Sequence, residues 1–267
     1  MSIPNRQIGW GTEENLLWQI SKQLEYLTKV VYNIPNNTTT TSTSSTTTTT
    51  TTSAPVPGNV GIAASTDFDI VGDFTIELFV NMSNLDGAQR PYSFGVYPAA
   101  NAISIETGQL YFWANNAPLV NGTFEPNIGT WYHLCIMGLE GTVNMFVDGF
   151  NIASSPYLTG EISSQDLPLT IGYGNEPGSY FNGLMSNFRW NNTALYDPAG
   201  FTVPTATLPN IAENVLLIFQ GTNLPMQLAD NSGNGHNATN AGATYSASNP
   251  FVATEGSLPY PIVNGKS

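Results

Sequence analysis

Paired carboxylates are the first arrangement that could give this chain an enzymatic activity, because glycoside hydrolysis needs two of them facing one cleft. On a β-strand such residues share a face only at alternating positions, as in the pattern E-x-D-x-E. The chain has no such triplet, and its close alternation Asp67-Phe68-Asp69 precedes the first clear strand. Glu77 stands between Ile76 and Leu78, so we expect it to face solvent or lie at a sheet edge. We therefore predict no catalytic residue and no enzymatic activity.

Nucleophilic and zinc chemistry both need histidine with suitable partners. The chain has two histidines and one cysteine, which form neither a triad pattern nor a zinc signature. His133 follows Trp131-Tyr132 in a predicted strand, and we expect it to be a packed or hydrogen-bonded structural side chain. His236 lies in a Gly/Asn-rich loop, and Cys135 in the apolar run LCIM is expected to be buried.

One loop resembles the opening of a calcium site built from oxygen ligands. It reads Asp230-Asn231-Ser232-Gly233-Asn234-Gly235, with Asp230, Ser232 and Asn234 as the candidate ligands. Ala241 occupies the twelfth position, where a bidentate Glu would complete the site. We expect a Gly/Asn-rich turn here, with calcium as the alternative, and we expect no other cofactor.

Glycan binding commonly uses an aromatic side chain beside amide groups, and two places in the chain combine these residue types. The first is a loop around Pro177-Gly178 that contains Tyr173, Asn175, Tyr180 and Asn182. The second contains Trp113, Asn115 and Asn116. The alternative for both places is that the aromatic side chains fill the core at the ends of the fold.

Short apolar and aromatic runs separated by turn residues fill the chain from Phe74 onward. Val147-Asp148-Gly149-Phe150 predicts a tight hairpin, since Asp-Gly tolerates positive φ values. The other predicted strands are residues 74–80, 102–105, 109–114, 131–136, 143–147, 169–172, 183–190 and 215–219. Many short strands with few charges predict a mainly β fold, an antiparallel sandwich of two sheets.

A Thr/Ser run at residues 38–53 divides the chain. Such a segment has no apolar side chains to bury, and β-branched Thr disfavours helix, so a disordered or extended stalk is expected. We therefore divide the chain into an attachment arm with a helix (1–34), a stalk (35–57) and one large β domain (58–267).

Residues 12–34 predict a helix of about five turns, with Thr12 as the N-cap and Pro35 after its end. A heptad seam is formed by Leu17, Ile20, Leu24, Leu27 and Val31. So short a helix next to a stalk should associate with copies of itself or with a partner, and the alternative is that it folds back onto the β domain. Ahead of it, a non-helical peptide is expected to dock on a partner through Ile3, Arg6, Ile8 and Trp10.

The charge distribution excludes some classes of partner. The three basic residues of the arm are balanced by Glu13, Glu14 and Glu25, so the rest of the chain carries the whole net charge of −13. Its only fixed cations are Arg90, Arg189 and Lys266. Nucleic acid and anionic membranes are therefore unexpected partners. No run resembles a secretory signal or a membrane span, so we expect neither a signal peptide nor membrane insertion.

The N-terminal sequence IPNRQIGW followed by ENLLWQISKQLEYLTKVV resembles the N-terminal arm of many tailed-bacteriophage virion proteins. Gly11 stands where that family more often has a polar residue. The resemblance implies attachment to a virion, usually as part of a fibre or surface appendage, and such fibres are usually trimers.

The later chain resembles the laminin-G-like, concanavalin-A-like jelly roll over roughly residues 58–250. The elements that carry the resemblance are residues 72–77, 131–133, 146–149, 169–172 and 181–189, followed by Thr193-Ala194-Leu195-Tyr196. This resemblance implies a fold that frequently binds glycans or proteins and sometimes calcium.

Together these features predict a non-enzymatic virion structural protein on the phage surface, made in the host cytoplasm. We favour a homotrimeric capsid fibre that displays a head for host or environmental glycans and is attached to a capsid or tail protein. The alternatives are a tail fibre or receptor-binding protein, a decoration protein without a specific ligand, and, least favoured, a glycan hydrolase.

Overall fold

The computed structural model describes residues 58–96, 101–158 and 160–251. The predicted arm, heptad helix and stalk lie outside these residues. So do the residues predicted for attachment and association, namely Ile3, Arg6, Ile8, Trp10, Leu17, Ile20, Leu24, Leu27 and Val31.

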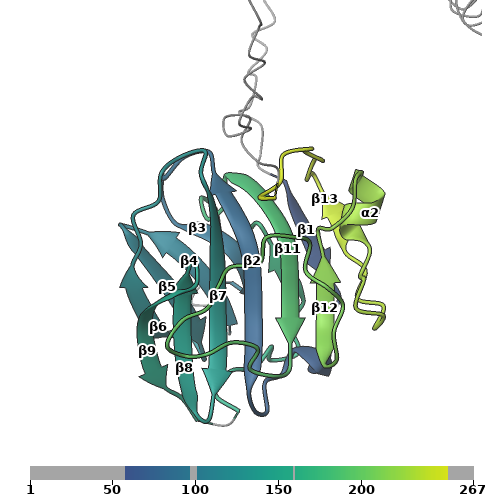
Figure 1. The fold of residues 1–267 in the computed structure, drawn as a ribbon. Helices are drawn as coiled ribbons and strands as arrows, with labels where there is room; N and C mark the ends of the chain where they lie inside the picture. The colour runs from purple at the N-terminus through teal and green to yellow at the C-terminus, as the bar shows by residue number, and fades with distance from the viewer. Residues whose placement is uncertain (1–57, 97–100, 159, 252–267) are drawn as a thin grey trace, which may run out of the picture. The chain divides into compact units, whose positions relative to one another are not determined.

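The described chain forms two antiparallel sheets that face each other (Figure 1). The seven-stranded sheet has the order β13 (Thr239–Ala241), β1 (Asn59–Ile62), β10 (Leu169–Ile171), β3 (Gln89–Phe94), β4 (Asn101–Glu106), β5 (Gln109–Ala114), β6 (Ala117–Thr123). The six-stranded sheet has the order β12 (Asn214–Ile218), β11 (Gly183–Asn191), β2 (Phe74–Met82), β7 (Trp131–Leu139), β8 (Thr142–Val147), β9 (Phe150–Pro156). The helical parts are the 3-10 turn η1 (Thr66–Phe68) and the short helix α2 (Leu224–Leu228). The predicted mainly β jelly-roll sandwich is confirmed. None of the described helices is long and apolar enough to cross a membrane.

The core lies between the sheets and follows the alternation of the strands. In β2 the side chains of Phe74, Ile76, Leu78, Val80 and Met82 all belong to it. An aromatic cluster of Phe68, Tyr92, Phe94 and Trp190 joins η1 and the two sheets, with Phe68, Tyr92 and Phe94 each within 6.0 Å of Trp190, measured between ring centroids. The predicted hairpin at Asp148-Gly149 is also present, with φ values of 49° and 77°.

The chain between β11 and β12, residues 192–213, crosses the outer face of the six-stranded sheet (Figure 1). We call it the crossing segment. The Thr75 hydroxyl donates a hydrogen bond to the Thr193 carbonyl (2.8 Å), and the Phe201 amide donates to the Gly149 carbonyl (3.0 Å). The crossing segment therefore reaches from β2 to the hairpin between β8 and β9.

Glu77 lies beneath the crossing segment with 0% of its surface exposed, so the expectation that it faces solvent or an edge is wrong. Its Oε1 accepts a hydrogen bond from Arg189 Nε (2.7 Å), and its Oε2 accepts one from the Tyr196 hydroxyl (2.8 Å) and lies 2.8 Å from His133 Nε2. Burial alone would raise the pKa of Glu77, but the hydrogen bond and charge of His133 and the charge of Arg189 outweigh it and hold this pKa below its usual range. His133 thus has the structural role expected of it.

Candidate ligand-binding site

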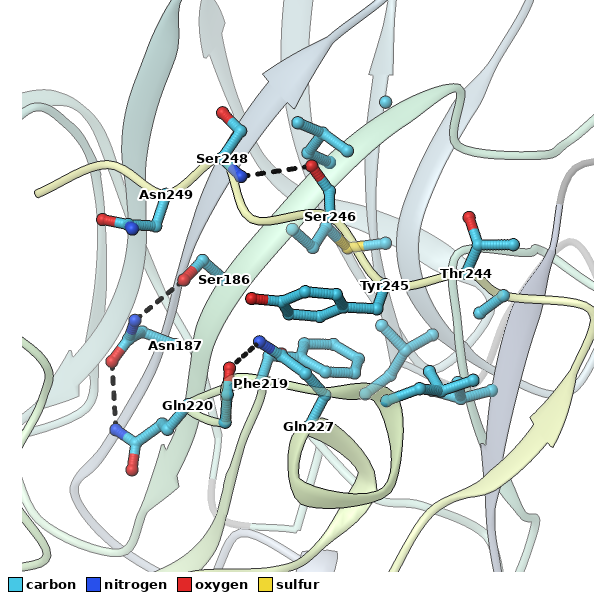
Figure 2. Close-up of a pocket in the computed structure, with 18 of the residues that line it drawn as sticks. Ser186, Asn187, Phe219, Gln220, Gln227, Thr244, Tyr245, Ser246, Ser248 and Asn249 are labelled. Atoms are coloured by element: carbon cyan, nitrogen blue, oxygen red, sulfur yellow. Dashed lines mark hydrogen bonds between the residues drawn. The ribbon is translucent and has the colours of Figure 1, made fainter. Parts of the chain in front are cut away.

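A pocket of about 800 Å³ opens between β11, the end of β12, α2 and the C-terminal segment 242–251 (Figure 2). Residues 205–207 of the crossing segment, Ser83-Asn84 after β2, residues 58–60 at β1 and Ile171 of β10 also line it. A volume of this size is in the range of small-molecule sites. Concave, partly apolar pockets with a few polar groups are the usual form of such sites.

Two neighbouring residues of the pocket wall have unusual backbone conformations. Asn187 has a φ of 52° and Phe219 a φ of 64°, and the Asn187 amide donates a hydrogen bond to the Phe219 carbonyl (3.1 Å). A positive φ is tolerated by Asn but is a strained conformation for a bulky side chain such as Phe. At the same place the pairing of β11 with β2 shifts register between Ser186 and Arg189. Bulges and local strain of this kind concentrate at binding sites, where they redirect side chains.

The polar wall beside this bulge is held by its own hydrogen bonds (Figure 2). Asn187 Nδ2 donates to Ser186 Oγ (2.8 Å), and Asn187 Oδ1 accepts from Gln220 Nε2 (3.0 Å). The backbone amide of Leu208 also donates to Asn187 Oδ1 (2.9 Å). Ser186 and Asn187 are buried, so these groups are fixed before any ligand arrives.

Tyr245 is the aromatic side chain that extends across the pocket. It is 39% exposed, and Figure 2 shows its hydroxyl directed toward the side that carries Ser186 and Asn187. Neither this hydroxyl nor Asn249 Nδ2 makes a hydrogen bond to another described residue, whereas Asn249 Oδ1 accepts from the Phe251 amide (3.0 Å). An aromatic face beside uncommitted hydroxyl and amide groups can bind a ligand that is apolar on one face and hydroxylated at its edges.

The structure brings Tyr173 and Tyr180 together, as the first glycan-site prediction requires. Their rings stack with centroids 4.2 Å apart and an interplanar angle of 14°. Asn175 instead holds the loop, because its Nδ2 donates to the Gly95 carbonyl (2.9 Å) and its Oδ1 accepts from Thr170 Oγ1 (3.2 Å). Asn182 lines the 800 Å³ pocket, whereas the other three residues of this prediction do not.

The structure places Trp113 on β5 of the seven-stranded sheet and Asn115 in the turn that follows β5, and neither lines the pocket. Trp113 is only 8% exposed, and its indole N–H donates to Ser104 Oγ (2.9 Å). Asn115 and Asn116 are exposed in the turn between β5 and β6, with φ values of 48° and 65°. Their conformation makes them turn residues, and Trp113 offers a ligand little surface.

The candidate calcium ligands form a closed turn. The Asp230 carboxylate accepts hydrogen bonds from the amides of Leu217 (3.1 Å), Ser232 (2.9 Å) and His236 (3.0 Å) and from Ser232 Oγ (2.8 Å). Asn234 turns its Nδ2 toward the carbonyl of Asn214 (2.7 Å). A calcium ion would have to displace these donors, so the arrangement favours the turn, and calcium binding stays a prediction. Across the described ranges, no group of three or more His, Cys, Asp or Glu side chains could hold a metal ion.

Sequence reasoning missed most of the pocket. Tyr245, Asn187, Gln220 and Asn249 come from three separate parts of the chain that meet only in the folded structure. The one available signal was a Tyr within a stretch of Ser, Ala and Asn after the last long strand. By itself, that composition is typical of a surface loop.

The sequence profile of the concanavalin A-like lectin/glucanases superfamily matches residues 57–198, more than half of the chain. No curated protein sequence matches it. A candidate carbohydrate-binding protein from Bacteroides ovatus has a similar structure, with a TM-score of 0.54 and 16% identity. That match covers 69% of this chain and 56% of the other, so the chain spans little more than half of that protein.

Two further structures show weaker likeness. Domain 4 of an extracellular arabinanase from Geobacillus stearothermophilus, solved with arabinotriose, has a TM-score of 0.42 and 18% identity, with 52% of this chain and 68% of that one covered. Domains LG4-5 of the mouse laminin α1 chain have a TM-score of 0.38 and 15% identity, with 55% and 44% covered. The sheet order and the profile match agree, and the chain belongs to the concanavalin A-like lectin/glucanases superfamily.

Proposed function

We propose that the β domain is a glycan-binding head and that the glycan binds in the pocket around Tyr245. The observation that carries the proposal is the combination within one cavity of an exposed aromatic ring, polar groups without a hydrogen bond to another described residue, and a fixed amide wall. Sugars present hydroxyl groups at their edges and C–H groups on their faces, and this lining can bind both. The structural similarity to a candidate carbohydrate-binding protein supports the same class of ligand.

We further propose that the head binds its glycan without cleaving it. Glycoside hydrolysis needs two carboxyl groups at the scissile bond. No Asp or Glu lines the pocket within the part of the chain that the structure describes. The buried Glu77 already binds Arg189 and Tyr196 under the crossing segment.

A glycan array probed with the full chain tests this proposal. Wild-type protein is expected to bind a defined set of glycans, and Tyr245→Ala is expected to weaken that binding about tenfold or more, since it removes the aromatic surface and its hydroxyl. Phe150→Ala is the control, because Phe150 is 76% exposed on β9 and does not line the pocket. Absence of binding by the wild type, or equal binding by Tyr245→Ala, would contradict the proposal. The former would favour a decoration protein without a specific ligand.

The N-terminal sequence supports a second part of the proposal, that the head is displayed on a phage virion. Residues 1–34 would attach the chain to a capsid or tail protein and associate as a homotrimer, and residues 35–57 would act as the stalk. We favour a capsid fibre over a tail fibre because only residues 35–57 separate the arm from the β domain, which is short for the shaft of a tail fibre. The head would then lie on the virion surface, available to host or environmental glycans.

The assembly can be tested by measuring solution mass. The full chain is expected to be a trimer, whereas a chain that begins at Pro57 is expected to be a monomer, because the heptad seam is removed. Light scattering after size-exclusion chromatography gives both masses. A trimer in both cases would place the assembly interface in the β domain, and a monomer in both would mean that the helix needs another protein.

A further inference from the structure

We infer that the pocket selects uncharged glycans and rejects those that carry carboxylate groups, an inference that rests on the proposed glycan-binding function. Among the described residues, no Asp, Glu, Lys, Arg or His side chain lines the pocket. Its polar groups are hydroxyls, carboxamides and backbone groups. A lining without charge can satisfy hydroxyl groups but cannot neutralise an ion.

The arginines of the described chain are engaged elsewhere. Arg189 pairs with Glu77 beneath the crossing segment. Arg90 lies 3.3 Å from Glu106 and 3.5 Å from Glu176 on the other sheet. A carboxylate in the pocket would lose hydration without gaining a cation from the residues that the structure describes, and such a transfer is unfavourable.

The same lining suits a neutral sugar. Tyr245 and Asn249 offer a hydroxyl and an amide nitrogen that no other described residue occupies. Met185, Phe219 and Leu228 are partly buried and supply apolar surface to the pocket. The polar groups can therefore bind the hydroxyl groups at the edges of a pyranose, and the apolar side chains can pack against its faces.

The charge of the whole chain adds a second, weaker barrier. The net charge is −13, which repels anionic ligands at long range. Salt screens this repulsion beyond about 8 Å at physiological ionic strength. Salt does not, however, restore the hydration that a buried carboxylate loses. Discrimination against acidic glycans should therefore persist at high salt.

Calorimetry with the full chain provides the test. The probes are the neutral hexose oligosaccharides that bind on the array and the same oligosaccharides oxidised at C6 to uronic acids. The oxidised forms are expected to bind at least about tenfold more weakly, both at about 0.1 M and at about 0.5 M sodium chloride. Ser248→Lys places a cation at the rim of the pocket and is expected to reduce the difference, whereas Val71→Lys, on an exposed residue outside the pocket, should not.

The outcomes separate this inference from the proposed function. Equal or tighter binding of the oxidised oligosaccharides by the wild type would overturn the inference while leaving glycan binding intact. Array binding confined to acidic glycans would also overturn the inference and leave glycan binding intact. If neutral and acidic glycans both fail to bind, the proposed function fails and the inference fails with it.

Discussion

Glu77→Gln is expected to lower the free energy of unfolding by about 3–5 kcal/mol, the usual cost of removing one partner from a buried ion pair. The substitution keeps the shape of the side chain and removes its charge. Arg189, which is buried and pairs with Glu77, would then carry an uncompensated charge beneath the crossing segment. Tyr196 would also lose the carboxylate oxygen that accepts the hydrogen bond from its hydroxyl group.

Urea denaturation followed by circular dichroism measures this effect. Glu106→Gln is the matched control, because Glu106 pairs with Arg90 at 3.3 Å but is partly exposed. Loss of the pair between Glu106 and Arg90 is expected to lower the free energy of unfolding by about 1 kcal/mol or less, as is typical of pairs that water can screen. A similar decrease in the free energy of unfolding in the two variants would contradict the assigned role of Glu77.

The same ion pair predicts how stability depends on pH. The pKa of Glu77 is lowered in the folded protein from its ordinary value of 4.5. The unfolded chain therefore binds the proton more readily, so the contribution of Glu77 is fully present above about pH 4.5 and is lost as the pH falls through its folded pKa. The difference in stability between wild type and Glu77→Gln should be largest near neutral pH and shrink as the pH falls below 4.5. A difference that grows on acidification would be inconsistent with a lowered pKa.

The long strands of the sandwich could be predicted from sequence because each contains an apolar or aromatic run of strand length that is bounded by turn residues. Four strands were missed, namely β1, β3, β6 and β13, and two of these, β3 and β6, contain proline. Pro91 lies in β3, where the pairing with β4 shifts register, and Pro118 lies in β6, an edge strand of the seven-stranded sheet. Bulges and edges are the positions where a sheet tolerates proline, but a local pattern cannot show that a segment occupies one.

The buried position of Glu77 could not be predicted from local sequence either. Alternation correctly placed it on the face of β2 opposite the core. The crossing segment, more than a hundred residues later, turns that face into a second buried layer. The pocket presents the same difficulty, because its wall depends on the bulge at Asn187, the turn at Phe219 and the return of residues 242–251 to β11. Much of this wall also lies beyond the 57–198 range shared with the family.

Blocking the pocket is expected to have the largest effect on function. Ser248 is an exposed residue that lines the pocket, so Ser248→Cys introduces a thiol that a bulky maleimide can label. Cys135, the single native cysteine, is 0% exposed and should not react. The attached group would fill the space beside Tyr245 and exclude a sugar without changing the core. Val71→Cys, on a residue that is 77% exposed and outside the pocket, is the labelled control.

The decisive measurement is the affinity of Ser248→Cys for its best array glycan before and after labelling. Binding close to that of the wild type before labelling, and at least about tenfold weaker after it, with labelled Val71→Cys unaffected, is the expected result. Unchanged affinity of the fully labelled Ser248→Cys protein would show that the glycan binds elsewhere on the head.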